Sequence, residues 1–163
     1  MAVLPVIFFH AGFSFFQGGF LGVDVFFVIS GYLITGLIIG ELESGTFKLS
    51  NFYLRRAKRL LPALFFVAAL SFLLGYLVLL PADLKNLSQS LTSLSVFSSN
   101  IFFWLTTDYF SSAAELKPLL HSWSLAVEEQ FYIIFPIFLL TAWSLGREKI
   151  FTLIFILASV SLV

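Results

Sequence analysis

Several polar residues of this chain lie inside long apolar stretches, and their side chains could support acid–base chemistry. An ionisable group within a membrane helix is costly unless it faces a partner, the bundle interior or water, so each one marks a candidate functional site. His10 is suited to act as a general base, because a neutral imidazole accepts a proton near neutral pH. The alternative is an interfacial histidine that is hydrogen-bonded to a neighbouring carbonyl.

Three carboxylates accompany this histidine. Asp24 lies early in an apolar run, and we expect a buried carboxyl that orients a neighbouring donor. Glu128 and Glu129 are adjacent, so on a helix they point about 100° apart and only one is expected to be central. Ser124, Glu128 and Tyr132 share one helix face at four-residue spacing, which favours Glu128 as the functional carboxylate.

A basic cluster follows the second apolar run and contains Arg55, Arg56 and Arg59. One interpretation is a topology signal that contacts anionic lipid. The other is a phosphate-binding surface, because Arg56 and Arg59 share a helix face and guanidinium groups bind phosphate with two parallel hydrogen bonds. No glycine-rich phosphate loop is present in the sequence.

Composition then defines the class of protein. Of 163 residues, 60% are hydrophobic and 11% charged, against about 25% charged residues in soluble domains. The mean hydropathy of +1.02 excludes a soluble globular domain and a disordered chain. The net charge of zero argues against nucleic-acid binding. The absence of cysteine excludes disulfides and thiolate chemistry, and two distant histidines give no basis for a metal site.

The apolar residues form runs long enough for membrane helices. We therefore predict an all-α, polytopic transmembrane bundle with a single domain over residues 1–163. Because the first and last runs are short, the chain is expected to be the front part of a larger membrane protein, truncated at both ends. The runs are Met1–Phe16, Gly19–Gly40, Leu60–Leu80, Leu119–Gly146 and Ile150–Val163.

Charge position predicts the topology. The positive-inside rule places the basic cluster in the cytoplasm. Residues 83–107 are expected to lie at the outer face of the inner membrane or dip into it, and the alternative is that they span the membrane. The first helix is then expected to end outside, near Ser14. We expect 50–59 to form a short amphipathic helix at the inner surface. Pro118 is predicted to start the helix that carries Glu128 in its outer half.

Three sequence motifs follow one another along the chain. The first comprises VLPVIFFHAGF at 3–13 and GGFLGVDVFFVISGYLIT at 18–35. The second is FYLRRAKRLLPA at 52–63, and the third is HSWSLAVEEQFY at 121–132. Together they resemble the acyltransferase 3 family, the integral-membrane O-acyltransferases typified by O-antigen acetylases. The second motif resembles the arginine motif of the family's first cytoplasmic loop, and the third resembles its later glutamate motif.

The resemblance implies an O-acetyltransferase that moves an acyl group, commonly acetyl from acetyl-CoA, to a hydroxyl of a cell-envelope glycan such as lipopolysaccharide O-antigen or peptidoglycan. The acyl-CoA is a co-substrate, and no permanently bound cofactor is expected. By this resemblance His10 matches the essential histidine, and Arg56 and Arg59 match the arginine pair. Family members also carry an arginine before that histidine, which this chain lacks, so the fragment alone is expected to be inactive.

His10 and Glu128 are the predicted catalytic residues, and Arg55, Arg56 and Arg59 are expected to hold the CoA phosphates. The supporting residues are Asp24, Ser124, Glu129 and Tyr132. Whether the acyl group passes directly or through a covalent acyl-histidine stays open. The alternative functions are a glycan or acyl-precursor transporter with a proton relay, and a membrane scaffold without chemistry.

Overall fold

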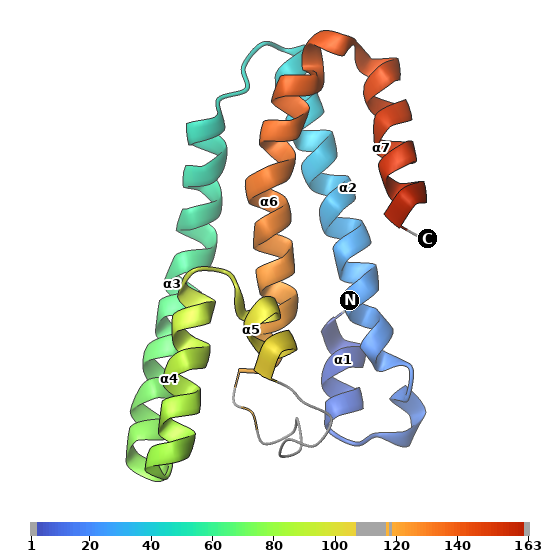
Figure 1. Cartoon of the computed structure of the whole chain (residues 1–163). Helices are drawn as coiled ribbons and strands as arrows, with labels where there is room; N and C mark the ends of the chain where they lie inside the picture. Colours follow the sequence, from blue (N-terminus) through green and yellow to red (C-terminus); the bar gives the residue numbers. More distant parts are fainter. Residues whose placement is uncertain (1–2, 107–116, 118, 162–163) are drawn as a thin grey trace. The chain divides into compact units, whose positions relative to one another are not determined.

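The computed structural model describes residues 3–106, 117 and 119–161, and every regular element among them is helical (Figure 1). The predicted all-α fold is therefore confirmed for the described residues. The α-helices are α1 (Val3–His10), α2 (Gly22–Glu43), α3 (Leu49–Val78), α4 (Pro81–Ser95), α5 (Ser99–Thr106), α6 (Ser122–Ala142) and α7 (Arg147–Ser161). Short 3-10 turns are η1 (Ser14–Phe16), η2 (Gly19–Leu21) and η4 (Trp143–Leu145).

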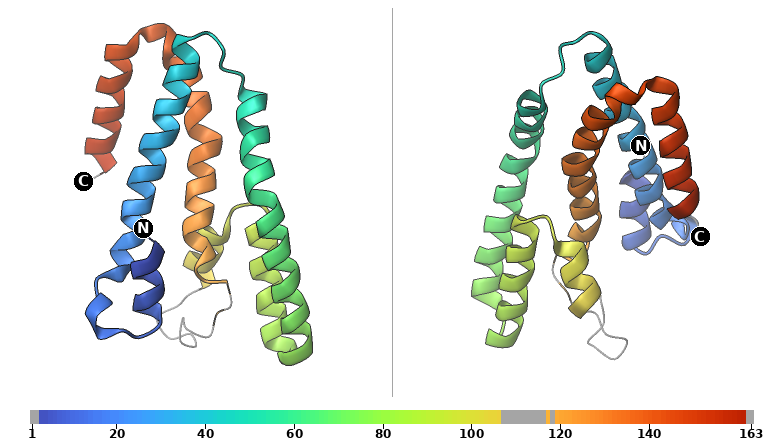
Figure 2. Two further views of the ribbon diagram at one scale, coloured as in Figure 1. Left: turned by 180° about the vertical axis from the view of Figure 1, so that it is seen from behind. Right: turned by 45° about the horizontal axis from the view of Figure 1, so that its top comes forward.

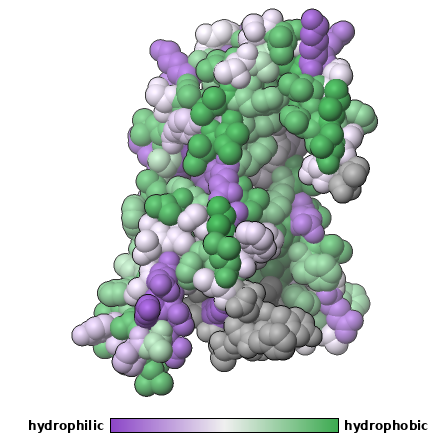
Figure 3. Space-filling model, in the orientation of Figure 1, coloured by the Kyte–Doolittle hydropathy of each residue, from purple (hydrophilic) through white to green (hydrophobic). Residues whose placement is uncertain are grey.

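Three helical segments are long and apolar enough to cross a membrane: Gly19–Glu43, Leu49–Val78 and Ser122–Leu145. Large apolar side chains such as Phe66, which is 68% exposed, lie on their surfaces, and apolar residues occupy much of the face visible in Figure 3. Such a surface would be unfavourable in water but is the expected one against lipid. The structure thus has the character of a multi-pass membrane protein.

The chain divides into two compact units. The first unit comprises Met1–Leu49 and Tyr132–Val163, and therefore contains α1, α2, the second half of α6 and α7. The second unit, Ser50–Phe131, contains most of α3, the two short helices α4 and α5, and the first half of α6. The predicted site residues are distributed over both units.

In the second unit, α4 turns back along α3 (Figures 1 and 2). Pro81 occupies the start of α4 after an extended Leu80, as suits a residue that lacks a backbone N–H. Buried Leu64, Leu87 and Leu94 join the two helices in one core. A helix of 15 residues is about 22 Å long, which is less than the hydrocarbon thickness of about 30 Å. Up to Thr106, the last described residue of the predicted segment 83–107, the chain thus contains two short helices rather than one span.

The amphipathic helix predicted at 50–59 is not separate. It is the beginning of α3, which continues without interruption through Pro62 to Val78, so the expectation of two elements was wrong. A proline inside a helix removes one hydrogen bond. Membrane helices tolerate that loss, because no other backbone conformation satisfies so many of their polar groups away from water.

Other helix ends also differ from the prediction. The first helix ends at His10 rather than near Ser14, and the last one begins at Arg147 rather than Ile150. The predicted helix start at Pro118 lies outside the described residues, and α6 begins at Ser122. Within the first unit, Arg147 Nη1 lies 3.0 Å from Glu43 Oε1, so an exposed ion pair joins the start of α7 to the end of α2.

Candidate active site

His10 is the last residue of α1, and the residues that follow it explain why the helix ends there. Gly12 adopts a φ of +78°, which favours glycine. The N–H of Gly12 donates to the Phe9 carbonyl at 3.0 Å, and the N–H of Phe13 donates to the Phe8 carbonyl at 3.1 Å. The Phe8 and Phe13 rings meet edge to face at 5.5 Å. This is a complete Schellman motif with its hydrophobic contact, and it places His10 at the carboxyl end of α1.

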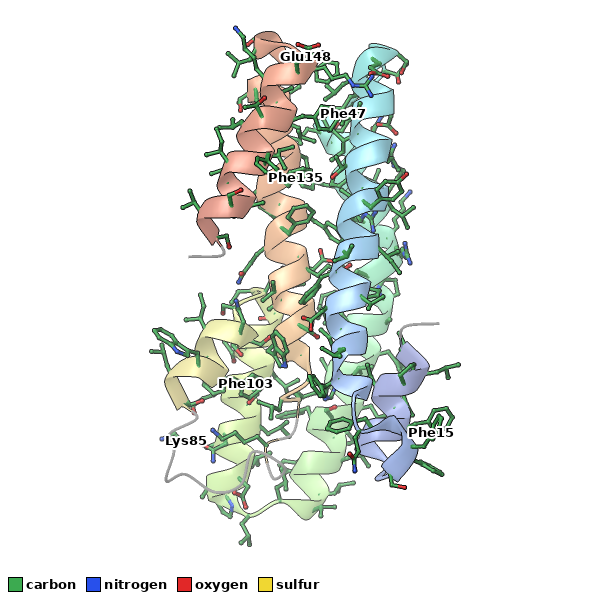
Figure 4. The ribbon with its side chains drawn as sticks, turned by 90° about the vertical axis from the view of Figure 1, so that its right-hand side faces the viewer. Phe15, Phe47, Lys85, Phe103, Phe135 and Glu148 are labelled. Atoms are coloured by element: carbon green, nitrogen blue, oxygen red, sulfur yellow. The ribbon has the colours of Figure 1, made fainter. Side chains whose placement is uncertain are left out.

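A second contact holds α1 in place within the first unit. Gly19 is buried, and a Cβ atom added there would lie 2.1 Å from the Pro5 carbonyl oxygen and 2.7 Å from Phe9 Cβ. The backbone of η2 therefore approaches the helix that carries His10 more closely than any other residue type would allow. The Phe9 and Phe20 rings add an edge-to-face contact at 5.9 Å. In contrast, Phe15 projects outward from the connection between α1 and α2 (Figure 4).

Asp24 lies in the first turn of α2 and is exposed. The expectation of a buried carboxyl was therefore wrong. A carboxylate in a first helical turn is stabilised by the exposed N–H groups and the helix dipole, so Asp24 does not require a buried partner. Its position at the start of α2 keeps it in the first unit together with His10.

The predicted polar stripe is present on α6, but its members have different surroundings. The Ser124 hydroxyl donates locally to the His121 carbonyl at 3.1 Å. Glu128 is partly buried. Tyr132 is 5% exposed, and its phenol is hydrogen-bonded to the hydroxyl of Ser30 on α2. The stripe thus ends in an interhelical contact of the first unit.

The two adjacent glutamates differ in burial. Glu129 is 8% exposed, whereas Glu128, which the sequence favoured as the central carboxylate, is only partly buried. Glu129 lies within electrostatic range of Glu128 and of the Arg56 guanidinium. The second unit therefore brings the arginine motif of α3 and the glutamate motif of α6 into one electrostatic environment.

The three arginines are also not equivalent. Arg55 and Arg59 are exposed, whereas Arg56 is partly buried. The Arg56 guanidinium carbon lies 5.8 Å from the centre of the Phe52 ring, and Phe52 is 1% exposed. A cation over an aromatic face is attracted by the ring, and the planar guanidinium can also stack on it, which favours arginine over lysine at this position. Among the described residues, no group of three His, Cys, Asp or Glu side chains could hold a metal ion.

Sequence reasoning missed an amide pair in the second unit. Gln130 exchanges two hydrogen bonds with Asn100 on α5. Gln130 could have been found as the carboxylates were, because it is a polar residue inside an apolar helix. Its partner Asn100 could not be found from residue spacing.

Comparison with known proteins identifies the family. Residues 1–163 match the family model described as an acyltransferase domain, so the chain belongs to the acyltransferase 3 family. The peptidoglycan O-acetyltransferase OatA of Listeria monocytogenes is 42% identical over 142 residues, which are 86% of this chain and 23% of that protein. A putative O-acetyltransferase of Staphylococcus aureus (strain COL) is 42% identical over 144 residues, with the same shares of 86% and 23%.

An uncharacterised protein of Haemophilus influenzae is 44% identical over 126 residues, covering 77% of this chain and 51% of the relative. The chain thus spans about half or about a quarter of the length of these relatives. No solved structure matches the chain. Family membership and the three candidate spans define an integral membrane protein of an O-acyltransferase family.

Proposed function

We propose that this chain forms part of an inner-membrane O-acetyltransferase that moves an acetyl group from acetyl-CoA to a hydroxyl of a cell-envelope glycan. The observation that carries the proposal is the family match over all 163 residues, which includes the histidine, arginine and glutamate motifs. Relatives bearing O-acetyltransferase names support it. The same match favours acyl transfer over the transporter interpretation.

The reaction requires a base for the acceptor hydroxyl. In the proposed step, a nitrogen of the His10 imidazole takes the hydroxyl proton while the hydroxyl oxygen attacks the thioester carbonyl carbon. The new C–O bond forms, the C–S bond breaks, and the CoA sulfur leaves with the proton returned by the imidazole. In this role the single histidine of α1 acts first as base and then as acid.

The arginines are proposed to bind the donor. Acetyl-CoA carries several phosphate oxygens, and guanidinium groups match them bidentately. Arg55 and Arg59 are exposed on α3, while Arg56 is held by the Phe52 ring. We assign all three to the CoA phosphates.

The carboxylates are proposed to stabilise charge and to position groups during the transfer. Glu128 either stabilises the charge that forms on the imidazole or positions the acceptor hydroxyl. Glu129, which is buried and lies within range of Arg56, is proposed to fix the surroundings of the arginine motif. Asp24, Ser124 and Tyr132 are assigned to positioning rather than to proton transfer.

The acceptor is proposed as a glycan hydroxyl. OatA is named for peptidoglycan, and lipopolysaccharide O-antigen carries the same functional group. Both are therefore acceptors to be tested with the same assay.

The test uses the full-length protein in lipid vesicles, with acetyl-CoA labelled in the acetyl group and either peptidoglycan fragments or lipopolysaccharide as acceptor. We expect alkali-labile label on one glycan and release of one free CoA thiol for each ester formed. Vesicles without protein provide the background. Uptake of glycan or acyl precursor without any ester formation would contradict the proposal and support a transporter.

A further inference from the structure

The amide pair missed by sequence reasoning is reciprocal. Asn100 Nδ2 donates to Gln130 Oε1 at 3.1 Å, and Gln130 Nε2 donates back to Asn100 Oδ1 at 3.0 Å. Gln130 Nε2 also donates to the Phe97 carbonyl oxygen at 2.8 Å. All three residues are partly buried and belong to the second unit. We call this set, Asn100, Gln130 and the Phe97 carbonyl, the amide clamp.

The clamp holds a strained turn. Phe97 follows α4 with a φ of +53°, a left-handed conformation that is unfavourable for a bulky residue. Its N–H donates to the Leu94 carbonyl at 3.1 Å, and the Ser98 N–H donates to the Ser93 carbonyl at 2.8 Å. This is a Schellman motif with phenylalanine where glycine is usual. Such conformations persist only when the surroundings fix them, and they are concentrated at functional sites.

A second hydrogen bond links the first residue of α5 to the first residue of α6. The Ser99 hydroxyl, fully buried, donates to the Ser122 carbonyl oxygen at 2.9 Å. Ser122 and Gln130 are eight residues apart, which on a helix is about 12 Å. Glu128 and Glu129 lie between these two anchor points. The turn before α5 and the first turn of α5 therefore fix both the rotation and the register of this part of α6.

We propose that the amide clamp is a positioning device for the α6 carboxylates, and that Gln130 and Asn100 are positioning residues of the transfer reaction. The inference rests on the proposed function, because it assigns the carboxylates a role in acetyl transfer. Hydrogen bonds in apolar surroundings have few competing partners. Loss of Gln130 therefore leaves both the Asn100 amide and the Phe97 carbonyl without this partner, whereas loss of Asn100 removes only its two bonds to Gln130. Glu128 and Glu129 are then free to rotate with α6.

The test is a double-mutant cycle in the full-length protein, with Asn100→Ala, Gln130→Met and the double variant. Methionine keeps the length of glutamine and removes its hydrogen bonds. Asn86→Ala and Gln89→Ala are the matched controls, because they remove the same residue types from exposed positions of α4. Melting temperature in detergent and steady-state acetyl transfer are both measured.

We expect each single variant to lower the melting temperature by a few degrees, and the double variant to fall no further than the worse single one. We expect kcat to fall roughly ten- to a hundredfold, the size of effect that a small misplacement of a reacting group produces. The KM for acetyl-CoA should change by a smaller factor than kcat, because the clamp residues are not among the arginines assigned to the CoA phosphates and act on them only through Glu129. The controls should match wild type in both measurements.

Additive melting shifts would overturn the clamp and leave the proposed function intact. Non-additive melting shifts of the two single variants, together with an unchanged kcat, would overturn the positioning role and leave a pair that only stabilises the fold. An inactive wild-type protein would remove the proposed function and the positioning role together, while the melting cycle would still report on the pair. If Gln130→Met does not fold, the kcat and melting temperature of Asn100→Ala alone test the positioning role, because this variant keeps the Gln130 bond to the Phe97 carbonyl.

Discussion

The phenol of Tyr132 on α6 is hydrogen-bonded to the hydroxyl of Ser30 on α2, although 102 residues separate them in the chain. Each group satisfies the other within apolar helix surfaces, where an unpaired hydroxyl would be unfavourable. The contact joins the second half of α6 to α2 inside the first unit. The last residue of the glutamate motif thus has a definite structural partner.

Replacing Tyr132 by phenylalanine should destabilise the protein by about 0.5–1.5 kcal/mol, the usual range for a side-chain hydrogen bond between membrane helices. Ser30→Ala should have a similar effect, and the double variant should cost little more. The measurement is thermal unfolding of the full-length protein in detergent. Tyr32→Phe is the matched control, because Tyr32 is 78% exposed. Equal losses for Tyr32→Phe and Tyr132→Phe would show that the bond does not stabilise the fold.

Gly19→Ala should displace α1 and with it His10. The added methyl group would meet the Pro5 carbonyl oxygen, a backbone atom that cannot rotate away. The neighbouring variant Gly18→Ala is the control, since nothing lies within 4 Å of its added Cβ. We expect Gly19→Ala to lower both the melting temperature and the rate of acetyl transfer at least several-fold, and Gly18→Ala to change neither. Two variants with the same activity would mean that the position of α1 does not matter for transfer.

The arginine pair should govern the affinity for acetyl-CoA. Hydrogen bonds to charged groups contribute about 1.5–3 kcal/mol, so replacing Arg56 and Arg59 together by alanine should weaken binding at least tenfold. Lysine at both positions should restore affinity only in part, because the bidentate geometry is lost. Lys58→Ala removes a charge from an exposed position of the same helix and should have a smaller effect. Direct titration of the purified protein with acetyl-CoA measures this, and equal affinity of wild type and the double alanine variant would leave only the topology role.

Topology can be tested with single cysteines, because the chain contains none of its own. Cysteine at Ser44, in the turn after α2, should react with an impermeant maleimide only from the cytoplasmic side. Cysteine at Asn86, exposed on α4, should react only from outside. Ser112, where a cysteine is also expected to react only from outside, lies outside the described residues. Labelling of the Ser44 position only from outside would overturn the predicted orientation, and labelling of both positions from one side would contradict a span formed by α3.

The long apolar runs predicted α2, α3 and α6, because hydrophobic length alone decides which segments can span a membrane. The same signal could not show that α3 continues through Pro62, since helix continuity there depends on the apolar surroundings. The end of α1 was predictable in principle. Gly12 followed by Phe13 is a helix stop with a local sequence signature.

The candidate site was predictable in its residue types but not in its partners. Spacing located Glu128 and Glu129, but which of them is buried depends on how α6 packs, and the structure buries Glu129 more deeply. Likewise, Gln130 could be recognised as polar within an apolar helix, whereas Asn100 is brought to it only by the return of α4 and the turn at Phe97. Contacts between residues 30 positions apart follow from tertiary packing, which local periodicity does not encode.

The most direct test is acetyl transfer by His10→Gln in the full-length protein, compared with His121→Ala at the exposed position just before α6. Loss of a positioned base typically lowers the rate about 10²- to 10⁴-fold. We therefore predict that His10→Gln inserts and accumulates normally but forms no detectable glycan ester, whereas His121→Ala is affected only mildly. Adding Glu128→Gln to the His10 change should cost little more, as for residues that act as a unit. Near-normal ester formation by His10→Gln would contradict the assignment of His10 as the base and, with it, the proposed mechanism.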